Sequence, residues 1–120
     1  MNSRILVVDD ENDILEVLEL VLREEGFEVE TASNVDSIFS KIEEFHPNLI
    51  LLDVFLGEYD GRKVCSSIKT NNKTRDIPVI MLSAYSSLSG SIKEVGAEDF
   101  IPKPFSIYTL IDHIQRQISA

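Results

Sequence analysis

The sequence predicts an α/β fold in which helices cover both faces of a doubly wound, five-stranded parallel sheet. Short apolar runs alternate with segments of helical periodicity five times along the 120 residues. Three of these runs are almost continuously apolar, which is typical of strands buried on both faces of a parallel sheet. Because no linker or repeat interrupts the alternation, we expect a single domain spanning residues 1–120.

Each element has its own support in the residue pattern. The expected strands are the runs at residues 5–8, 28–32, 49–52, 78–82 and 99–101. Apolar residues at helical spacing predict helices at about 13–25, 35–45 and 107–118, a further helix beginning after residue 60, and another around 88–95. The helix around 88–95 is the weakest prediction, because four serines and a glycine at 86–91 lower its helix propensity.

Capping residues mark where several of these helices begin and end. Gly26 is expected to end the first helix in a left-handed conformation. Ser33 is expected to cap the amino terminus of the second helix, Asp60 that of the third and Ser106 that of the fifth. Capping residues therefore support the ends of these helices independently of their periodicity.

Composition limits the class of function. The formal net charge is −10, from 21 acidic and 11 basic residues, so a nucleic-acid backbone would be repelled and direct binding to it is not expected. Cys65 is the only cysteine, which excludes an internal disulfide, favours a reducing compartment and suits a core position. No signal-peptide pattern and no apolar run of membrane-spanning length is present. We therefore expect a cytoplasmic protein without a membrane partner.

Polar residues follow four of the expected strands at the point where each strand ends. Asp9 and Asp10 follow the first strand, Asp53 the third, Ser83 the fourth, and Lys103 the fifth, between two prolines. Parallel strands form sites at their carboxyl ends, so these five side chains are expected to meet. Each has an ordinary explanation when taken alone, such as a helix cap or a loop hydroxyl. Together, the carboxylates, hydroxyl and ammonium are the groups that phosphoryl transfer to a carboxylate requires.

The turn after the first strand favours a cation over a nucleotide. A nucleotide-binding turn would carry glycines whose amides contact phosphate, whereas this chain has Asp9-Asp10-Glu11. Adjacent carboxylates suit a hard cation such as Mg²⁺, which takes oxygen ligands. Asp53, brought close to this acidic pair, would be repelled without a metal ion.

The sequence resembles the receiver domains of two-component response regulators over essentially its whole length. The residues that carry the resemblance are Asp9-Asp10-Glu11, Asp53 with Asp60-Gly61, Ser83-Ala84 and the stretch 96–105. The resemblance implies a flavodoxin-like fold with strand order 2-1-3-4-5. It also implies a signalling phosphoprotein that accepts a phosphoryl group from a histidine kinase or histidine phosphotransfer protein and switches a surface for a downstream protein target.

The resemblance assigns the acceptor and the metal ligands. Asp53 would accept the phosphoryl group. Asp10 and Asp53, with the backbone carbonyl of Phe55, would bind Mg²⁺ or Mn²⁺ directly, and Asp9 would act mainly through bound water. The only reactions catalysed would be the domain's own metal-dependent phosphoryl transfer and dephosphorylation.

The resemblance also assigns the residues that respond to the phosphoryl group. Ser83 would donate a hydrogen bond to one phosphoryl oxygen, and Lys103 would pair with another. Phe100 would be the aromatic residue that turns inward as Ser83 moves. The Lys103–Pro104 peptide bond would be cis.

Several positions depart from the usual receiver pattern. Gly57 stands where many receivers carry proline, which predicts a looser loop after the acceptor. Phe100 lacks the hydroxyl of the commoner tyrosine, and the segment from Ser83 to Lys103 is about two residues shorter than is common. Phe55 and Tyr85 would flank the path of hydrolytic water without a group to orient it, which predicts a long-lived phosphorylated state.

Three alternatives stay open at this point. A phosphohydrolase of the haloacid-dehalogenase type also forms an aspartyl phosphate, but its nucleophile follows the first strand in an Asp-x-Asp motif, and a cap domain is usual. A degenerate receiver that acts only as a binding module would not need all five polar side chains. A receiver excised from a longer protein is the alternative to a stand-alone, chemotaxis-regulator-like protein, which we expect because the fifth helix runs to the end of the sequence.

His46 and His113 are too scattered to form a phosphohistidine relay, and His46 suits a helix end.

Overall fold

Five apolar runs pair into one parallel sheet. In the computed structural model, which describes residues 2–119, the sheet consists of β1 (Arg4–Val8), β2 (Glu28–Ala32), β3 (Leu49–Asp53), β6 (Val79–Ser83) and β7 (Asp99–Pro102). Their order is β2-β1-β3-β6-β7, and every neighbouring pair is parallel. A separate hairpin is formed by β4 (Phe55–Leu56) and β5 (Tyr59–Asp60). With the hairpin set aside, the sheet has the order 2-1-3-4-5, so the expected α/β class and topology are confirmed.

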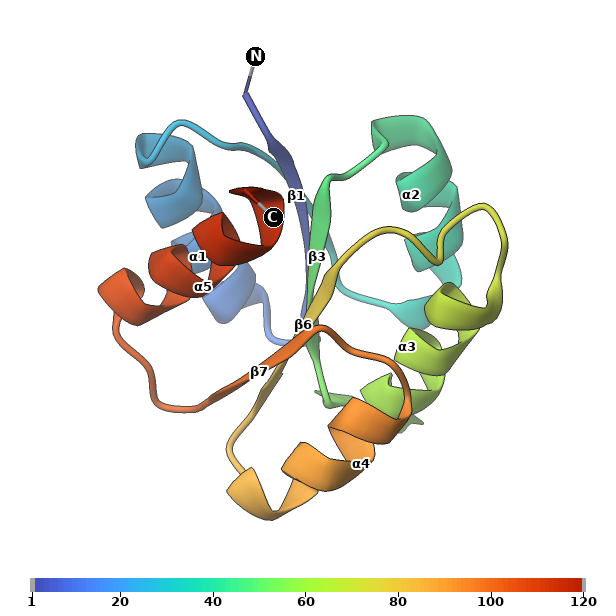
Figure 1. The fold of residues 1–120 in the computed structure, drawn as a ribbon. Helices are drawn as coiled ribbons and strands as arrows, with labels where there is room; N and C mark the ends of the chain where they lie inside the picture. The colour runs from blue at the N-terminus through green and yellow to red at the C-terminus, as the bar shows by residue number, and fades with distance from the viewer. Residues whose placement is uncertain (1, 120) are drawn as a thin grey trace.

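Helices cover both faces of the sheet. They are α1 (Asn12–Glu24), α2 (Ile38–Phe45), α3 (Gly61–Thr70), α4 (Ser89–Glu94) and α5 (Ile107–Ser119), and short 3₁₀ turns precede α2 at Val35–Ser37 and α4 at Ser86–Leu88. Helices α1 and α5 lie on one face, and α2, α3 and α4 lie on the other (Figure 1). Within residues 2–119, no helix has the length and apolar character that crossing a membrane requires.

The core consists of two apolar layers separated by the central strands. In β3, Leu49 and Leu51 pack with α1 and α5, whereas Ile50 and Leu52 pack with the opposite helices. This alternation explains why the central strands, such as β3, are continuously apolar, because both of their faces are buried. Cys65 is fully buried in the second layer, and burial raises the pKa of its thiol to about 11, which confirms a core position for the cysteine.

Three of the predicted caps are present. Gly26 follows α1 with a φ of 96°, a conformation that glycine adopts without steric cost. A side-chain oxygen of Asp60 accepts a hydrogen bond from the N–H of Arg62 at 2.9 Å, at the start of α3. The hydroxyl of Ser106 accepts one from the N–H of Thr109 at 3.1 Å, at the start of α5. Side chains therefore satisfy N–H groups that a helix terminus leaves without an internal partner.

The second helix differs from the prediction at its start. Ser33 is not the cap; the side-chain oxygen of Asn34 accepts a hydrogen bond from the N–H of Ser37 at 3.0 Å. Asn34 is better placed to cap the helix because its backbone is extended, with a φ of −142°, immediately before the first helical turn. At the other end of α2, His46 has a φ of 53° and its N–H donates to the carbonyl of Ile42, so His46 has the expected helix-end role.

A hydrogen-bonded hairpin occupies the segment expected to be a loose loop. Phe55 pairs with Asp60 and Leu56 with Tyr59, which leaves Gly57 and Glu58 as the two turn residues. Gly57 has a φ of 62°, and a positive φ at the first of two turn residues is what a type II′ hairpin requires. Sequence reasoning missed this hairpin, although the Gly-Glu pair between apolar and aromatic residues was the signal for it.

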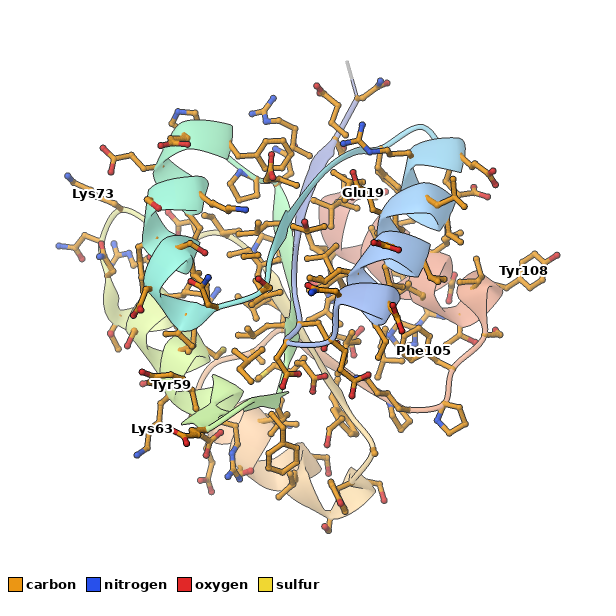
Figure 2. The ribbon with its side chains drawn as sticks, turned by 180° about the vertical axis from the view of Figure 1, so that it is seen from behind. Glu19, Tyr59, Lys63, Lys73, Phe105 and Tyr108 are labelled. Carbon is orange, nitrogen blue, oxygen red and sulfur yellow. The ribbon has the colours of Figure 1, made fainter. Side chains whose placement is uncertain are left out.

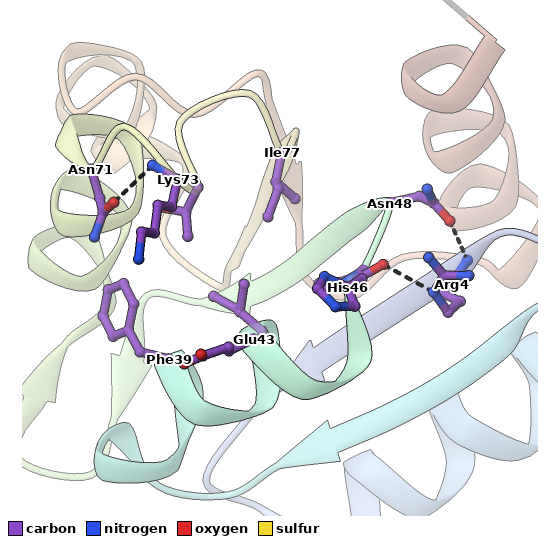
Figure 3. A pocket seen from close by; sticks show the side chains of 11 residues that line it. Arg4, Phe39, Glu43, His46, Asn48, Asn71, Lys73 and Ile77 are labelled. Carbon is purple, nitrogen blue, oxygen red and sulfur yellow. Dashed lines mark hydrogen bonds between the residues drawn. The ribbon is translucent and has the colours of Figure 1, made fainter.

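A cavity of about 630 Å³ lies at the opposite end of the sheet from the expected site. Arg4, at the start of β1, and Asn48, just before β3, form one side of it, and Phe39 of α2 and Lys73 form the other (Figure 3). The backbone N–H of Arg4 donates to the side-chain oxygen of Asn48 at 2.7 Å, and its side-chain Nε–H donates to the carbonyl of His46 at 2.9 Å (Figure 3). These contacts are at the amino-terminal ends of the strands, so the cavity is remote from Asp53.

Candidate functional site

The acidic and basic residues that follow the strands do come together. The Nζ atom of Lys103 lies 2.6 Å from Oδ2 of Asp53 and 3.5 Å from Oδ2 of Asp9. Ser83 ends β6, beside β3, where Leu82 is in register with Asp53. Asp10 is joined to the group through the hairpin that follows Asp53. The parallel sheet therefore brings four distant segments to one edge, as its topology predicts.

Asp53 is held between a backbone amide and an ammonium group. Its carboxylate is largely buried at the end of β3, and Oδ1 accepts a hydrogen bond from the N–H of Phe55 at 3.2 Å. Burial lowers the pKa of Lys103, but the hydrogen bond and charge of Asp53 raise it more, so the net pKa lies above its ordinary value. Lys103 is therefore a permanent positive charge on one oxygen of Asp53.

Asp9 is the most buried of the acidic residues at this edge. It is 1% exposed; its Oδ1 accepts the N–H of Glu11 at 3.0 Å, but its Oδ2 has no hydrogen-bond partner within the described residues. The pKa of Asp9 is raised to about 7, chiefly by burial and also by the neighbouring Asp53, which together outweigh the lowering by the Glu11 amide and Lys103. A buried carboxylate oxygen without a hydrogen-bond donor is costly; the Lys103 ammonium, 3.5 Å away, offsets part of that cost, and a divalent cation would offset more.

Asp10 differs from Asp9 in being exposed. Its Oδ2 accepts a hydrogen bond from the N–H of Gly57 at 2.9 Å. Across residues 2–119, no three His, Cys, Asp or Glu side chains are grouped so as to hold a metal by themselves. The ligand set implied by the resemblance needs only two carboxylates and the backbone oxygen of Phe55. The Asp9 oxygen that lacks a hydrogen-bond donor and this all-oxygen donor set fit a hard divalent cation.

Ser83 and Phe100 lie on neighbouring strands beside the acidic group. The hydroxyl of Ser83 is buried and accepts a hydrogen bond from the N–H of Tyr85 at 3.0 Å. The carbonyl of Ser83 accepts the N–H of Lys103 at 2.8 Å, which ties the ends of β6 and β7 together. Phe100 is half-buried and packs against the core layer that includes α4. The Lys103–Pro104 peptide bond is cis, as the resemblance implies.

Two aromatic residues meet beside Asp53. The rings of Phe55 and Tyr85 are edge-to-face, with centroids 5.6 Å apart and an interplanar angle of 84°. Phe55 donates its N–H to Asp53 and Tyr85 donates its N–H to Ser83, so the backbone fixes both residues next to the site. The side chains are nevertheless 46% and 58% exposed, so they cover the site only in part.

The sequence analysis named Gly61 as part of the receiver resemblance but did not identify Arg62. A Cβ atom on Gly61 would lie 2.0 Å from the carbonyl oxygen of Asp53, so only glycine fits where α3 passes the end of β3. Arg62 binds Asp60 at 2.7 Å and the hydroxyl of Ser91 in α4 at 3.0 Å, so it links the hairpin to α4. A lone arginine carries no pattern that would have shown this link.

Comparisons with known proteins agree with the geometry. The family model described as the response regulator receiver domain matches residues 5–115. The phosphate regulon transcriptional regulatory protein PhoB of Escherichia coli is 40% identical over 117 residues, which cover 96% of this chain and 51% of PhoB. The chain spans about half the length of the curated relatives it matches. The expectation of a stand-alone protein therefore stays a prediction.

Solved structures show the same architecture. The receiver domain of NtrX from Brucella abortus is 36% identical with a TM-score of 0.87, covering 97% of this chain and 98% of its own. The receiver domain of the sensor histidine kinase PA1611 from Pseudomonas aeruginosa is 26% identical with a TM-score of 0.88, and the match covers both chains fully. That structure has a magnesium ion coordinated in its active-site cleft.

Proposed function

The chain belongs to the response regulator receiver family of two-component signalling, and we propose from this premise that Asp53 accepts the phosphoryl group. The single observation that carries the proposal is the contact of the Lys103 ammonium with the buried Asp53 carboxylate, beside an Asp9 oxygen that lacks a hydrogen-bond donor. This arrangement combines a nucleophilic oxygen with a fixed positive charge. Residues 1–120 form one receiver domain in this proposal.

The residues around Asp53 have separate roles in the transfer. An oxygen of Asp53 bonds to the phosphorus of a phosphohistidine as the phosphorus–nitrogen bond breaks, and the histidine ring leaves with the nitrogen electron pair. Lys103 pairs with one phosphoryl oxygen, and the hydroxyl of Ser83 donates to another. Asp10, Asp53 and the carbonyl of Phe55 would hold Mg²⁺ or Mn²⁺, and Asp9 would act through water. The bound cation would supply positive charge that offsets the carboxylates and the phosphoryl group.

An apolar groove of about 570 Å³ beside Lys103 supports a histidine kinase or phosphotransfer protein as donor. Ile14 and Val17 of α1 line it on one side, and Phe105 and Ile107 line it on the other. Phe105 lies beside the amino-terminal end of α1 (Figure 2). A donor helix with an apolar face would bury this groove while bringing its histidine to Asp53.

The output of the domain is a shift in a protein-binding surface. Ser83 and Phe100 lie on adjacent strands, and α4 and α5 flank β7. A new bond from Ser83 to the phosphoryl group favours an inward Phe100, which changes the surface presented to a downstream protein. The domain catalyses only its own metal-dependent phosphoryl transfer and dephosphorylation.

Treatment with acetyl phosphate and Mg²⁺, followed by intact mass measurement, tests the proposal. We expect one phosphoryl group on the wild-type protein and none on Asp53→Asn or in the presence of a chelator. Labelling of Asp53→Asn at another residue would contradict the assignment. Sustained turnover of a small phosphate ester would favour the phosphohydrolase alternative, and failure to label under any condition would favour a binding module.

A further inference from the structure

The Asp10 carboxylate is exposed but not free. It lies in the loop after β1, where an exposed aspartate would ordinarily sample several rotamers. In this structure its Oδ2 accepts the N–H of Gly57 at 2.9 Å, and within residues 2–119 no other hydrogen bond to the Asp10 side chain is present. One backbone amide therefore sets the position of this carboxylate.

Only a restricted set of residues could supply that amide. Gly57 is the first of the two turn residues in the β4–β5 hairpin and has a φ of 62°. A proline there would have no N–H, and its ring would hold φ near −65°. The receivers that carry proline at this position, as the resemblance describes them, cannot form this hydrogen bond. The contact between Gly57 and Asp10 is thus a consequence of this chain's departure from the usual pattern.

The same hairpin also holds the second carboxylate of the expected metal site. The N–H of Phe55 donates to Oδ1 of Asp53 at 3.2 Å, and the N–H of Gly57, two residues later, donates to Oδ2 of Asp10. The other oxygen of Asp10 stays available to a cation. Ligating carboxylates are commonly oriented by hydrogen bonds of this kind, and their loss typically costs about 10- to 100-fold in metal affinity.

We propose that Gly57 is a positioning residue that holds Asp10 ready to bind the divalent cation, an inference that rests on the proposed function. The hairpin provides the geometry, and the left-handed conformation of Gly57 turns its N–H towards Asp10. The entropy cost of ordering the Asp10 carboxylate is then met when the protein folds and does not reduce the affinity for the ion. A Cβ at this position would lie 3.9 Å from the Asp10 oxygen, so the obstacle to a side chain at residue 57 is the positive φ and not a lack of space.

Mg²⁺ titration without a phosphodonor, followed through backbone amide chemical shifts, tests the proposal. Gly57→Pro should weaken Mg²⁺ binding about tenfold or more, because it removes the N–H and the positive φ. Gly57→Asn is the matched control, because asparagine keeps the N–H and is found at positive φ more often than most residues other than glycine, so this variant should bind Mg²⁺ more tightly than Gly57→Pro. A folded Gly57→Pro protein that binds Mg²⁺ as tightly as the wild type would overturn the proposal.

A second measurement does not depend on the proline variant folding. In the metal-free wild type, the Gly57 amide should exchange slowly with solvent, and Asp10→Ala should accelerate that exchange. Equal exchange in the two proteins would overturn the proposal. Labelling of Asp53 separates the two hypotheses: if the wild type labels and binds Mg²⁺ but both tests of Gly57 fail, only the role of Gly57 is wrong. If the wild type neither labels nor binds Mg²⁺, the proposed function and the role of Gly57 are both wrong.

Discussion

The double substitution Phe55→Asn, Tyr85→Glu should shorten the life of the phosphorylated domain. Hydrolysis needs a water molecule in line with the bond between Asp53 and phosphorus. We expect Phe55 and Tyr85, whose rings meet beside Asp53, to flank that approach, and neither carries a carboxylate or amide that could orient the water. We therefore expect the wild-type aspartyl phosphate to be long-lived, which would suit holding a signal or passing it along a relay.

The structure separates two contributions to the effect. An edge-to-face aromatic pair contributes about 0.5–1.5 kcal/mol, so opening the Phe55–Tyr85 pair alone should raise water access by roughly two- to tenfold. Both rings are about half exposed, which keeps this covering effect small. Positioning of the water by Asn and Glu should add the rest, for a total acceleration of about one to two orders of magnitude.

Phosphate release from the purified, labelled domain provides the assay. Phe55→Ala and Tyr85→Ala are the controls, because they remove the aromatic contact without adding a group that orients water. They should give only the smaller acceleration that loss of the aromatic pair predicts. Loss of the wild-type label within seconds would refute the reasoning, as would a double variant no faster than the alanine variants.

Three further predictions concern the acidic residues and the switch. Asp10→Ala should weaken Mg²⁺-dependent labelling more than Asp9→Ala, because Asp10 is the proposed direct ligand; equal, mild effects in a Mg²⁺ titration of labelling would contradict this. Ser83→Ala should still accept phosphate but show smaller chemical-shift changes around Phe100; wild-type changes would exclude coupling through the hydroxyl. In metal-free protein, the raised pKa of Asp9, about 7 against 3.8, means that the folded state holds the proton more tightly than the unfolded chain. Stability should therefore fall as pH rises from about 4 to about 7, by up to about 4 kcal/mol, and urea unfolding of Asp9→Asn should lack this fall.

The sheet and the edge that carries the site could be predicted because each strand shows its burial in its own sequence. A continuously apolar run such as 49–52 can be satisfied only by burial on both faces, and the alternation of strands and helices makes such a sheet parallel. Parallel strands share one carboxyl edge, so Asp9, Asp53 and Ser83 had to approach one another. Their chemistry then indicated the reaction class without knowledge of any distance.

The contacts that tune the site could not be predicted, because they join backbone groups to side chains across the fold. The bond from the N–H of Gly57 to Asp10 spans 47 residues, and nothing in the local sequence of Asp10 indicates it. Arg62 reaches Ser91 in α4 for the same reason, through the packing of two helices. The misplaced cap at Ser33 is a smaller error, since Ser33 and Asn34 are both good capping residues and only the backbone conformation distinguishes them.

The short segment between Ser83 and Lys103 shows how the site can stay intact while the output surface changes. Its two ends are fixed, because the carbonyl of Ser83 accepts the N–H of Lys103 at 2.8 Å. The two residues by which we expect this segment to be shorter than in common receivers would therefore come from the connection between β6 and β7, where α4 has only six residues after a 3₁₀ turn rich in serine. A helix so short has little stability of its own and depends on the packing of residues such as Ile92. Rearrangement of Phe100 beneath it would therefore move or loosen α4 at low cost, which is the response a switch surface needs.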